Sequence, residues 1–252
     1  MIDVHLSIMS HARPNNVPFM QKACVPFTCN WYVVKGEAQA YLDAGAHNIY
    51  ECEPGICQAR NMALKHAFEQ NLPSIQISDD LRSIKKIRLE HSKRVTEYVT
   101  VEQVAELLIK ELTDRKLFYG GVAVTSNALN YTGEDVSTNK LIVCDLNCFM
   151  PGCDFFDESL KQKEDYDLTV RQLLAHGGVV RLDNILCDFP HRNNVGGANT
   201  YRNFETEKLA MEELIKKWPN YLVPHRTREN QVSLDTKRIF QDRTFKTINL
   251  FE

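Results

Sequence analysis

The first 80 residues alternate between short apolar runs and helical segments, and this alternation constrains the fold more than any other feature of the chain. The apolar runs are typical of buried strands, and the segments between them carry apolar residues at helical spacing. Such an alternation predicts a parallel sheet with helices on its faces. We expect strands at 4–9, 31–34, 48–51 and 74–77, and helices at 38–44 and about 56–70.

The rest of the chain continues the pattern less regularly. Thr100 to Gln103 forms a capping box that begins an amphipathic helix. Further strands are expected at 119–124, 141–144 and 179–182, and helices at 164–176 and 204–218. Because no long linker interrupts these segments, we expect one α/β domain over residues 1–203. A helix and a basic tail, residues 204–252, would pack on it as a C-terminal extension.

Composition excludes several classes of protein. The chain has 252 residues, of which 43% are hydrophobic, so it can bury a core without disulfides. No apolar run approaches the roughly 18–20 residues of a membrane span, and no membrane partner is expected. None of the eight cysteines forms a C-x-x-C pair, which favours thiols in a reducing cytoplasm. A zinc site built from Cys144, Cys148 and Cys153 is the alternative.

Positive charge is concentrated in two stretches, although the net charge is −3. Residues 81–94 hold six Lys or Arg and one acid, and residues 216–246 hold eight Lys or Arg and three acids. Stretches of this kind can meet phosphates. A solvated charged face explains either stretch equally well.

The strongest chemical signal is a pair of carboxylates, Asp79 and Asp80, directly after an apolar strand. Ligands of open α/β sheets bind at the carboxyl edge, where such a strand ends. Adjacent carboxylates repel each other unless a cation lies between them. Mg²⁺ or Mn²⁺ shared with a diphosphate suits them, because these ions take carboxylate and phosphate oxygens together. A polar turn after the strand is the simpler alternative.

A second acidic group, Glu164 and Asp165, begins an expected helix. One of the two carboxylates can take a proton from an attacking hydroxyl. The favourable interaction of carboxylates with a helix N-terminus is a sufficient structural explanation as well.

Three polar groups are candidates for binding a phosphorylated ligand. Arg60 and Asn61 lie in the first turns of a helix, where an anion can be held. The other two groups lie in loops: Ser10 and Arg13 follow the first strand, and His191 and Arg192 stand beside Gly196 and Gly197, with His191 as a possible metal ligand and Arg192 as a phosphate ligand.

The order of these motifs resembles that of nucleotide-sugar glycosyltransferases of the GT-A fold, over about residues 3–203. The resemblance implies a Rossmann-like mixed sheet flanked by helices and a UDP-sugar donor. It assigns Asp80 to a divalent metal, with Asp79 beside it, and Asp165 to the general base of an inverting transfer. Arg60 and Asn61 match positions that border the donor. The chain has Ser78 where the family pattern D-x-D has its first acid.

Within this fold, the chain is most similar to the TET-associated and phage DNA glycosyltransferases. Members of that group attach a sugar, such as glucose or arabinose, to 5-hydroxymethylcytosine in DNA. The residues that carry the similarity are 10–14 (SHARP), 78–82 (SDDLR) and the basic tail. A protein or glycan acceptor, and a nucleotide- or DNA-binding module without turnover, are the alternatives. A nucleotidyltransferase would need a glycine-rich phosphate loop, and residues 10–16 contain no glycine.

Overall fold

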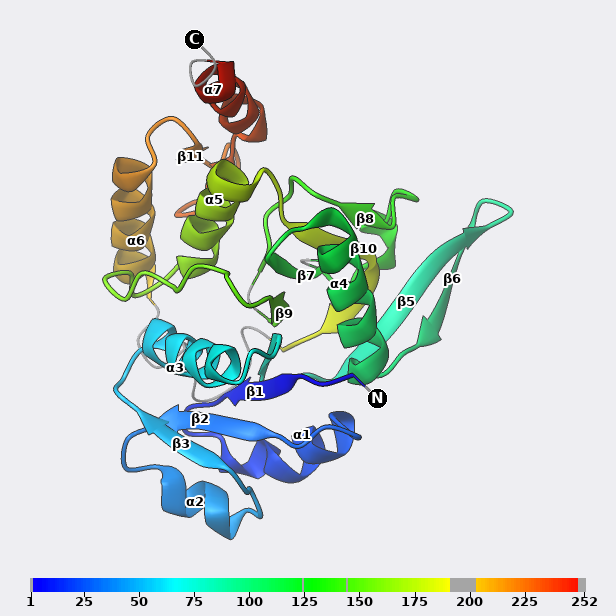
Figure 1. The fold of residues 1–252 in the computed structure, drawn as a ribbon, viewed down its shortest axis with the longest axis vertical. Coiled ribbons are helices and arrows are strands. Elements are labelled where there is room, and N and C mark those ends of the chain that lie inside the picture. The colour runs from blue at the N-terminus through cyan, green and yellow to red at the C-terminus, as the bar shows by residue number, and fades with distance from the viewer. Residues whose placement is uncertain (1, 124, 144, 191–202, 249–252) are drawn as a thin grey trace.

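The computed structural model describes residues 2–123, 125–143, 145–190 and 203–248. A ten-stranded mixed sheet forms its centre, with helices on both faces (Figure 1). The strands are β1 (His5–Met9), β2 (Asn30–Val34), β3 (Ile49–Cys52), β4 (Ser74–Ser78), β5 (Ser83–Glu90), β6 (Lys93–Tyr98), β7 (Tyr119–Ala123), β8 (Val136–Ser137), β9 (Leu146–Phe149) and β10 (Val180–Asp188). The expected α/β class, a Rossmann-like sheet flanked by helices, is confirmed.

Helices connect the strands and cover the sheet. The helices are α1 (Val17–Ala23), α2 (Ala38–Asp43), α3 (Ile56–Glu69), α4 (Val101–Arg115), α5 (Glu164–His176), α6 (Phe204–Lys217) and α7 (Thr236–Ile248), with 3₁₀ turns η1 (Pro14–Asn16) and η2 (Ala128–Asn130). The expected capping box of α4 is present, with Thr100 and Gln103 each bonding the other's backbone. Among the described residues, none of the helices has the length and apolar composition needed to cross a bilayer.

The period of two along the strands places the core on both faces of the sheet. On β4, Ile75 and Ile77 are fully or almost fully buried in the cluster that includes α1 and α4. The intervening Gln76 points the other way and bonds Arg60 of α3. A second cluster joins the sheet to α3, α5 and α6.

The strand order explains where a ligand site can form. Strands run in the order β3-β2-β1-β4-β9-β7-β10-β5-β6, with β8 paired to β10. The chain moves outward from β1 to β3 and then returns to β4 on the other side of β1, and all these pairs are parallel. Such a reversal creates a crevice at the carboxyl ends of the two central strands. In this sheet the reversal lies between the ends of β1 and β4, and this region is called the crevice below.

The prediction of a strand at 141–144 was wrong. Residues 141–143 form no strand, and the strand begins five residues later than expected, at Leu146. The apolar run is buried in a loop instead, because Ile142 fills a core position beside Gly121. β10 is longer than predicted, because beyond residue 182 it continues past a register shift and pairs with β5.

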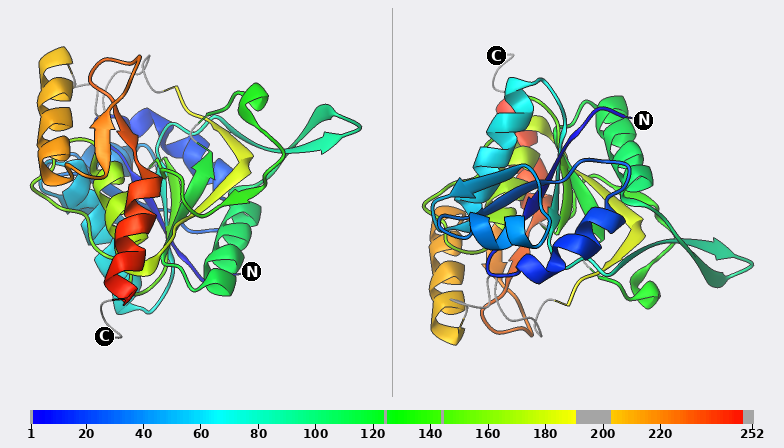
Figure 2. Two further views of the ribbon diagram at one scale, coloured as in Figure 1. Left: turned by 90° about the horizontal axis from the view of Figure 1, so that it is seen from above. Right: turned by 90° about the horizontal axis from the view of Figure 1, so that it is seen from below.

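The C-terminal segment, residues 204–248, adds α6, α7 and the small hairpin of β11 (Leu222–Pro224) and β12 (Val232–Leu234). Leu214, Leu222 and Ile239 from this segment share the core cluster of α5. On the opposite side of the molecule, β5 and β6 project as a twisted two-stranded arm (Figures 1 and 2). The two basic stretches therefore lie at opposite ends of the molecule rather than on one surface.

Candidate functional site

The crevice between β1 and β4 contains a compact group of charged side chains. Arg13, in the loop after β1, approaches both carboxylates that follow β4: its Nη1 lies 2.8 Å from Asp79 Oδ1 and 3.2 Å from Asp80 Oδ2. The Ser10 hydroxyl donates to Asp79 Oδ2. Ser10 and Arg13 formed one candidate group in the sequence and Asp79 and Asp80 formed another, and the structure brings the two groups together.

Helix α2 contacts this group through one side chain. The hydroxyl of Tyr41, which is fully buried, lies 2.5 Å from Ser10 Oγ and accepts a bond from the Arg13 backbone N–H at 3.1 Å. Burial raises the pKa of Asp79 to about 6, against the opposing effects of the Ser10 hydroxyl and the Arg13 guanidinium. The contacts with Ser10 and Arg13 lower the pKa of Asp79 and so favour its ionised form near neutral pH.

Arg60 connects the crevice to the N-terminus of α5. The residue is buried; its Nη1 donates to Gln76 of β4 at 3.2 Å, and its Nε lies 3.6 Å from the Glu164 carboxylate. Because α3 and α5 both begin at the carboxyl edge of the sheet, their N-termini face the same region. The sequence prediction placed Arg60 on a donor phosphate, whereas in the structure it joins β4 to Glu164.

Asp165 has the most strongly perturbed of the carboxyl groups at this edge. Burial, together with repulsion from Glu164 and Asp145, raises its pKa to about 7, against a bond from the Tyr166 backbone N–H and the positive charge of Arg60. A carboxyl group with this pKa exchanges protons at neutral pH, which suits a general base. Perturbed carboxyl groups of this kind are concentrated at functional sites.

Asp145 was missed by the sequence prediction. It directly precedes β9, and its carbonyl oxygen accepts the backbone N–H of Ser78 at 2.9 Å. Burial is the main cause of the raised pKa values of Asp165 and of the Cys187 thiol, and the Asp145 carboxylate adds to both shifts. Asp145 therefore lies between the end of β4, the start of α5 and the end of β10. The only sequence signal was an acid that follows an apolar run, which is common.

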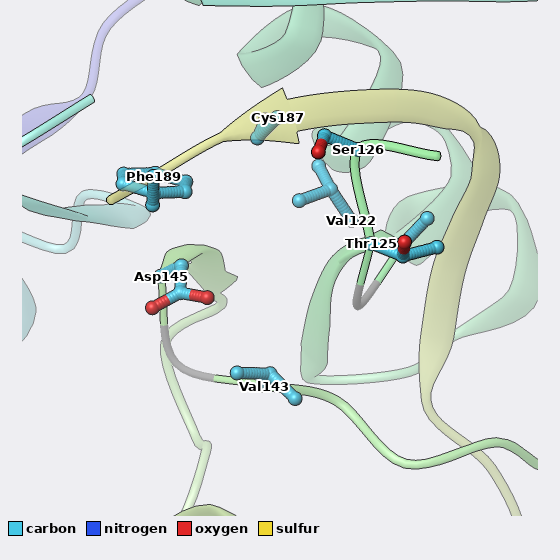
Figure 3. Close-up of a pocket in the computed structure, with 8 residues that line it drawn as sticks. Val122, Thr125, Ser126, Val143, Asp145, Cys187 and Phe189 are labelled. Carbon is cyan, nitrogen blue, oxygen red and sulfur yellow. The ribbon is translucent and has the colours of Figure 1, made fainter. Parts of the chain in front are cut away.

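A pocket of about 190 Å³ lies beside Asp145 (Figure 3). Its walls come from the ends of β7 and β10 and from the loops that follow β7 and precede β9. Phe189 and Val143 give it apolar surface, and Thr125, Ser126 and Asp145 give it hydroxyl and carboxylate groups. The pocket thus adjoins the acidic group on the side away from Ser10 and Arg13.

Other predicted site residues have different positions. The amide of Asn61 bonds the backbone N–H and carbonyl of Phe156 and the carboxylate of Glu158, so it fixes the loop before α5 rather than facing Asp79. His191 and Arg192 lie outside the described residues.

Two carboxylates that share one positive nitrogen fit a small hard cation, which takes one or two carboxylates together with diphosphate oxygens. Asp79 and Asp80 would hold it. Within the described ranges, no three or more His, Cys, Asp or Glu side chains form a ready-made metal cluster. Cys148 and Cys153, from the alternative zinc set, are buried, and Cys144 lies outside the described residues.

No model of a known protein family matches the chain, and no curated protein matches it.

Proposed function

We propose that the protein is a metal-dependent glycosyltransferase that moves a sugar from a UDP-sugar to a hydroxyl group. The main support for the proposal is that two acidic groups lie at the same edge of the sheet. Asp79 and Asp80 lie at the topological switch point, and Asp165, with a pKa of about 7, lies in the first turn of α5, within the electrostatic influence of Arg60 and Asp145. Arg60 bonds Gln76 of β4, and the Asp145 carbonyl accepts the N–H of Ser78, the residue before Asp79. One group suits a cation on a diphosphate and the other suits a proton acceptor.

The crevice at β1 and β4 would hold the donor. Its loop after β1 presents Ser10 and Arg13, and the carboxylates of Asp79 and Asp80 follow β4. Asp79 and Asp80 would hold a divalent cation there, which would supply positive charge for the leaving diphosphate. Arg13 would add a further positive charge on the same side.

Asp165 would act on the acceptor. As the acceptor oxygen bonds to C1 of the sugar, the bond from C1 to the diphosphate oxygen breaks, and the hydroxyl proton passes to the Asp165 carboxylate. Direct displacement of this kind inverts the configuration at C1. Glu164 would keep Arg60 beside the base, since the two side chains are paired.

For the acceptor, we propose 5-hydroxymethylcytosine in DNA. The pocket beside Asp145 has the size of a single small ring, an aromatic wall at Phe189 and a carboxylate that can accept from an exocyclic amine. A base reaches such a pocket only outside the helical stack. Separate observations favour a glycan or protein acceptor: the basic stretches lie at opposite ends, Arg88 is paired with Glu90 and Glu97, and Lys217 is paired with Asp157.

The test of the activity is hydrolysis of UDP-sugars by the purified protein with Mn²⁺, in the absence of acceptor. We expect slow release of UDP that Asp80→Asn abolishes, while Asp114→Asn on the exposed face of α4 leaves it unchanged. Absence of hydrolysis and of nucleotide binding with every UDP-sugar would refute the proposal.

The acceptor is tested separately, by mass spectrometry of hydroxymethylated DNA after incubation with each UDP-sugar. Affinity for that DNA should fall steeply between low and moderate salt if phosphates are contacted. Donor hydrolysis without DNA modification, and with no salt dependence, would favour the glycan or protein acceptor.

A further inference from the structure

We propose that Arg13 is a built-in competitor of the divalent cation. Without nucleotide, its guanidinium occupies the position between Asp79 and Asp80 that the cation needs. When a nucleoside diphosphate binds, Arg13 moves to the diphosphate and the cation takes its place, so that metal and nucleotide bind cooperatively. This inference rests on the proposed function, since it concerns the same crevice.

A single nitrogen atom of the Arg13 guanidinium contacts both carboxylates. Arg13 Nη1 lies within 3.2 Å of an oxygen from each carboxylate, so one positive centre bridges the two acids. A divalent cation that binds both carboxylates must occupy much the same position. All three side chains are nearly buried, with exposed fractions of 13% for Arg13, 3% for Asp79 and 11% for Asp80. A guanidinium and a cation therefore cannot both fit between the acids.

The backbone around Arg13 is held in place, so the exchange requires only a movement of the side chain. The Arg13 N–H bonds the Tyr41 hydroxyl, and the Ala12 N–H bonds the Glu37 carboxylate at 3.1 Å. The His11 side chain lies 2.8 Å from the same carboxylate of Glu37. These contacts anchor the backbone of the loop to α2, and the guanidinium contacts Asp79 and Asp80, the two residues that follow β4.

The diphosphate supplies the reason for cooperativity. Moving a guanidinium away from two carboxylates costs free energy unless it gains another anionic partner. A diphosphate is such a partner, because arginine bonds phosphate oxygens in a bidentate manner. Once Arg13 has moved, Asp79 and Asp80 would be free to hold the cation beside the diphosphate. Each ligand thus raises the affinity for the other by the same factor.

The test is Mn²⁺ binding to the full chain, measured by electron paramagnetic resonance with and without UDP. In the wild-type protein we expect weak binding of Mn²⁺ alone and much tighter binding with UDP. Arg13→Met should tighten binding of Mn²⁺ alone by about tenfold or more, the scale on which an adjacent arginine changes the proton affinity of a carboxylate. The same variant should reduce the effect of UDP.

Two further variants make the result decisive. Arg13→Lys keeps a positive charge and should bind Mn²⁺ less tightly than Arg13→Met, and Arg88→Met, on the projecting arm, should match the wild type. Equal or weaker Mn²⁺ binding by a folded Arg13→Met protein would overturn the inference. If that result accompanies normal hydrolysis of UDP-sugars, the proposed function stands without it. If no variant binds Mn²⁺ and no UDP-sugar is hydrolysed, both fail.

Discussion

Replacement of Asp165 by asparagine tests the role of this residue in two independent ways. The substitution preserves the size of the side chain and removes its ability to accept a proton. If Asp165 is the general base, turnover should fall by about 10²- to 10⁴-fold, the usual contribution of such a group. Binding of UDP and Mn²⁺ should remain nearly unchanged, because Asp79, Asp80 and Arg13 are intact.

The same variant should be more stable than the wild type at pH 8. The pKa of Asp165 is raised in the folded protein from 3.8 to about 7. The folded state therefore binds more protons than the unfolded state between these values, and wild-type stability falls as the pH rises from about 4 to about 7. The shift corresponds to at most about 4 kcal/mol. This net shift already includes the attraction to Arg60. Because Asp165 is only partly buried, solvent screening reduces the gain, and we expect about 1–2 kcal/mol at pH 8.

Thermal unfolding across pH and single-turnover kinetics measure the two effects. A gain of 1–2 kcal/mol corresponds to an increase in Tm of about 2–8 °C for a chain of this size. The gain should shrink as the pH falls towards 4, and the kcat of the wild type should rise with pH around 7. Asp114→Asn, an exposed acid on α4, should change neither property. Near-normal turnover of Asp165→Asn would refute the assignment as base, and a Tm difference independent of pH would refute the raised pKa.

Two predictions concern stability alone. Arg60→Met should lower the free energy of unfolding by about 3 kcal/mol in urea titrations, because the buried Glu164 carboxylate loses its partner. Lys65→Met is the control: it removes an exposed ion pair and should change the free energy of unfolding by less than about 1 kcal/mol. Gly121→Ala should cost about 1–3 kcal/mol in the same assay, since a Cβ there would lie 2.6 Å from the Asn147 amide nitrogen; an unchanged midpoint would show that β7 and β9 move apart easily.

The first 80 residues could be predicted well from the sequence because local and long-range preferences agree there. Each strand of that part is an apolar run, and the expected helices follow β2 and β3. The helix α1 after β1 was not predicted, and β4 leads directly into β5. Parallel strands joined by helices leave little freedom in topology. Their carboxyl ends must share one edge of the sheet, so the sequence alone indicates that Ser10 and Asp79 lie at the same edge. What it does not reveal is the direct bonding of Ser10 and Arg13 to Asp79.

The later part was harder because its apolar runs do not distinguish strand from buried loop. Leu141 to Val143 is as apolar as a strand, yet Ile142 fills the core from a loop. The sequence correctly placed Asn61 in the first turns of α3, but it did not show the partners of its side chain. The Asn61 amide bonds the loop at Phe156 and Glu158. Contacts between segments about 95 residues apart leave no local signal.

Asp145 illustrates why strand direction decides the composition of the site. β9 is antiparallel to both β4 and β7, so its first residue, not its last, lies at the edge where those strands end. An acid that precedes β9 therefore faces the acids that follow β4, and the bond from Ser78 N–H to the Asp145 carbonyl fixes this register. A parallel strand in the same place would put Asp145 at the opposite edge. Burial and the neighbouring Glu164 are the larger causes of the raised pKa of Asp165, and the further contribution of Asp145 is a consequence of one reversed strand, which no local pattern in the sequence encodes.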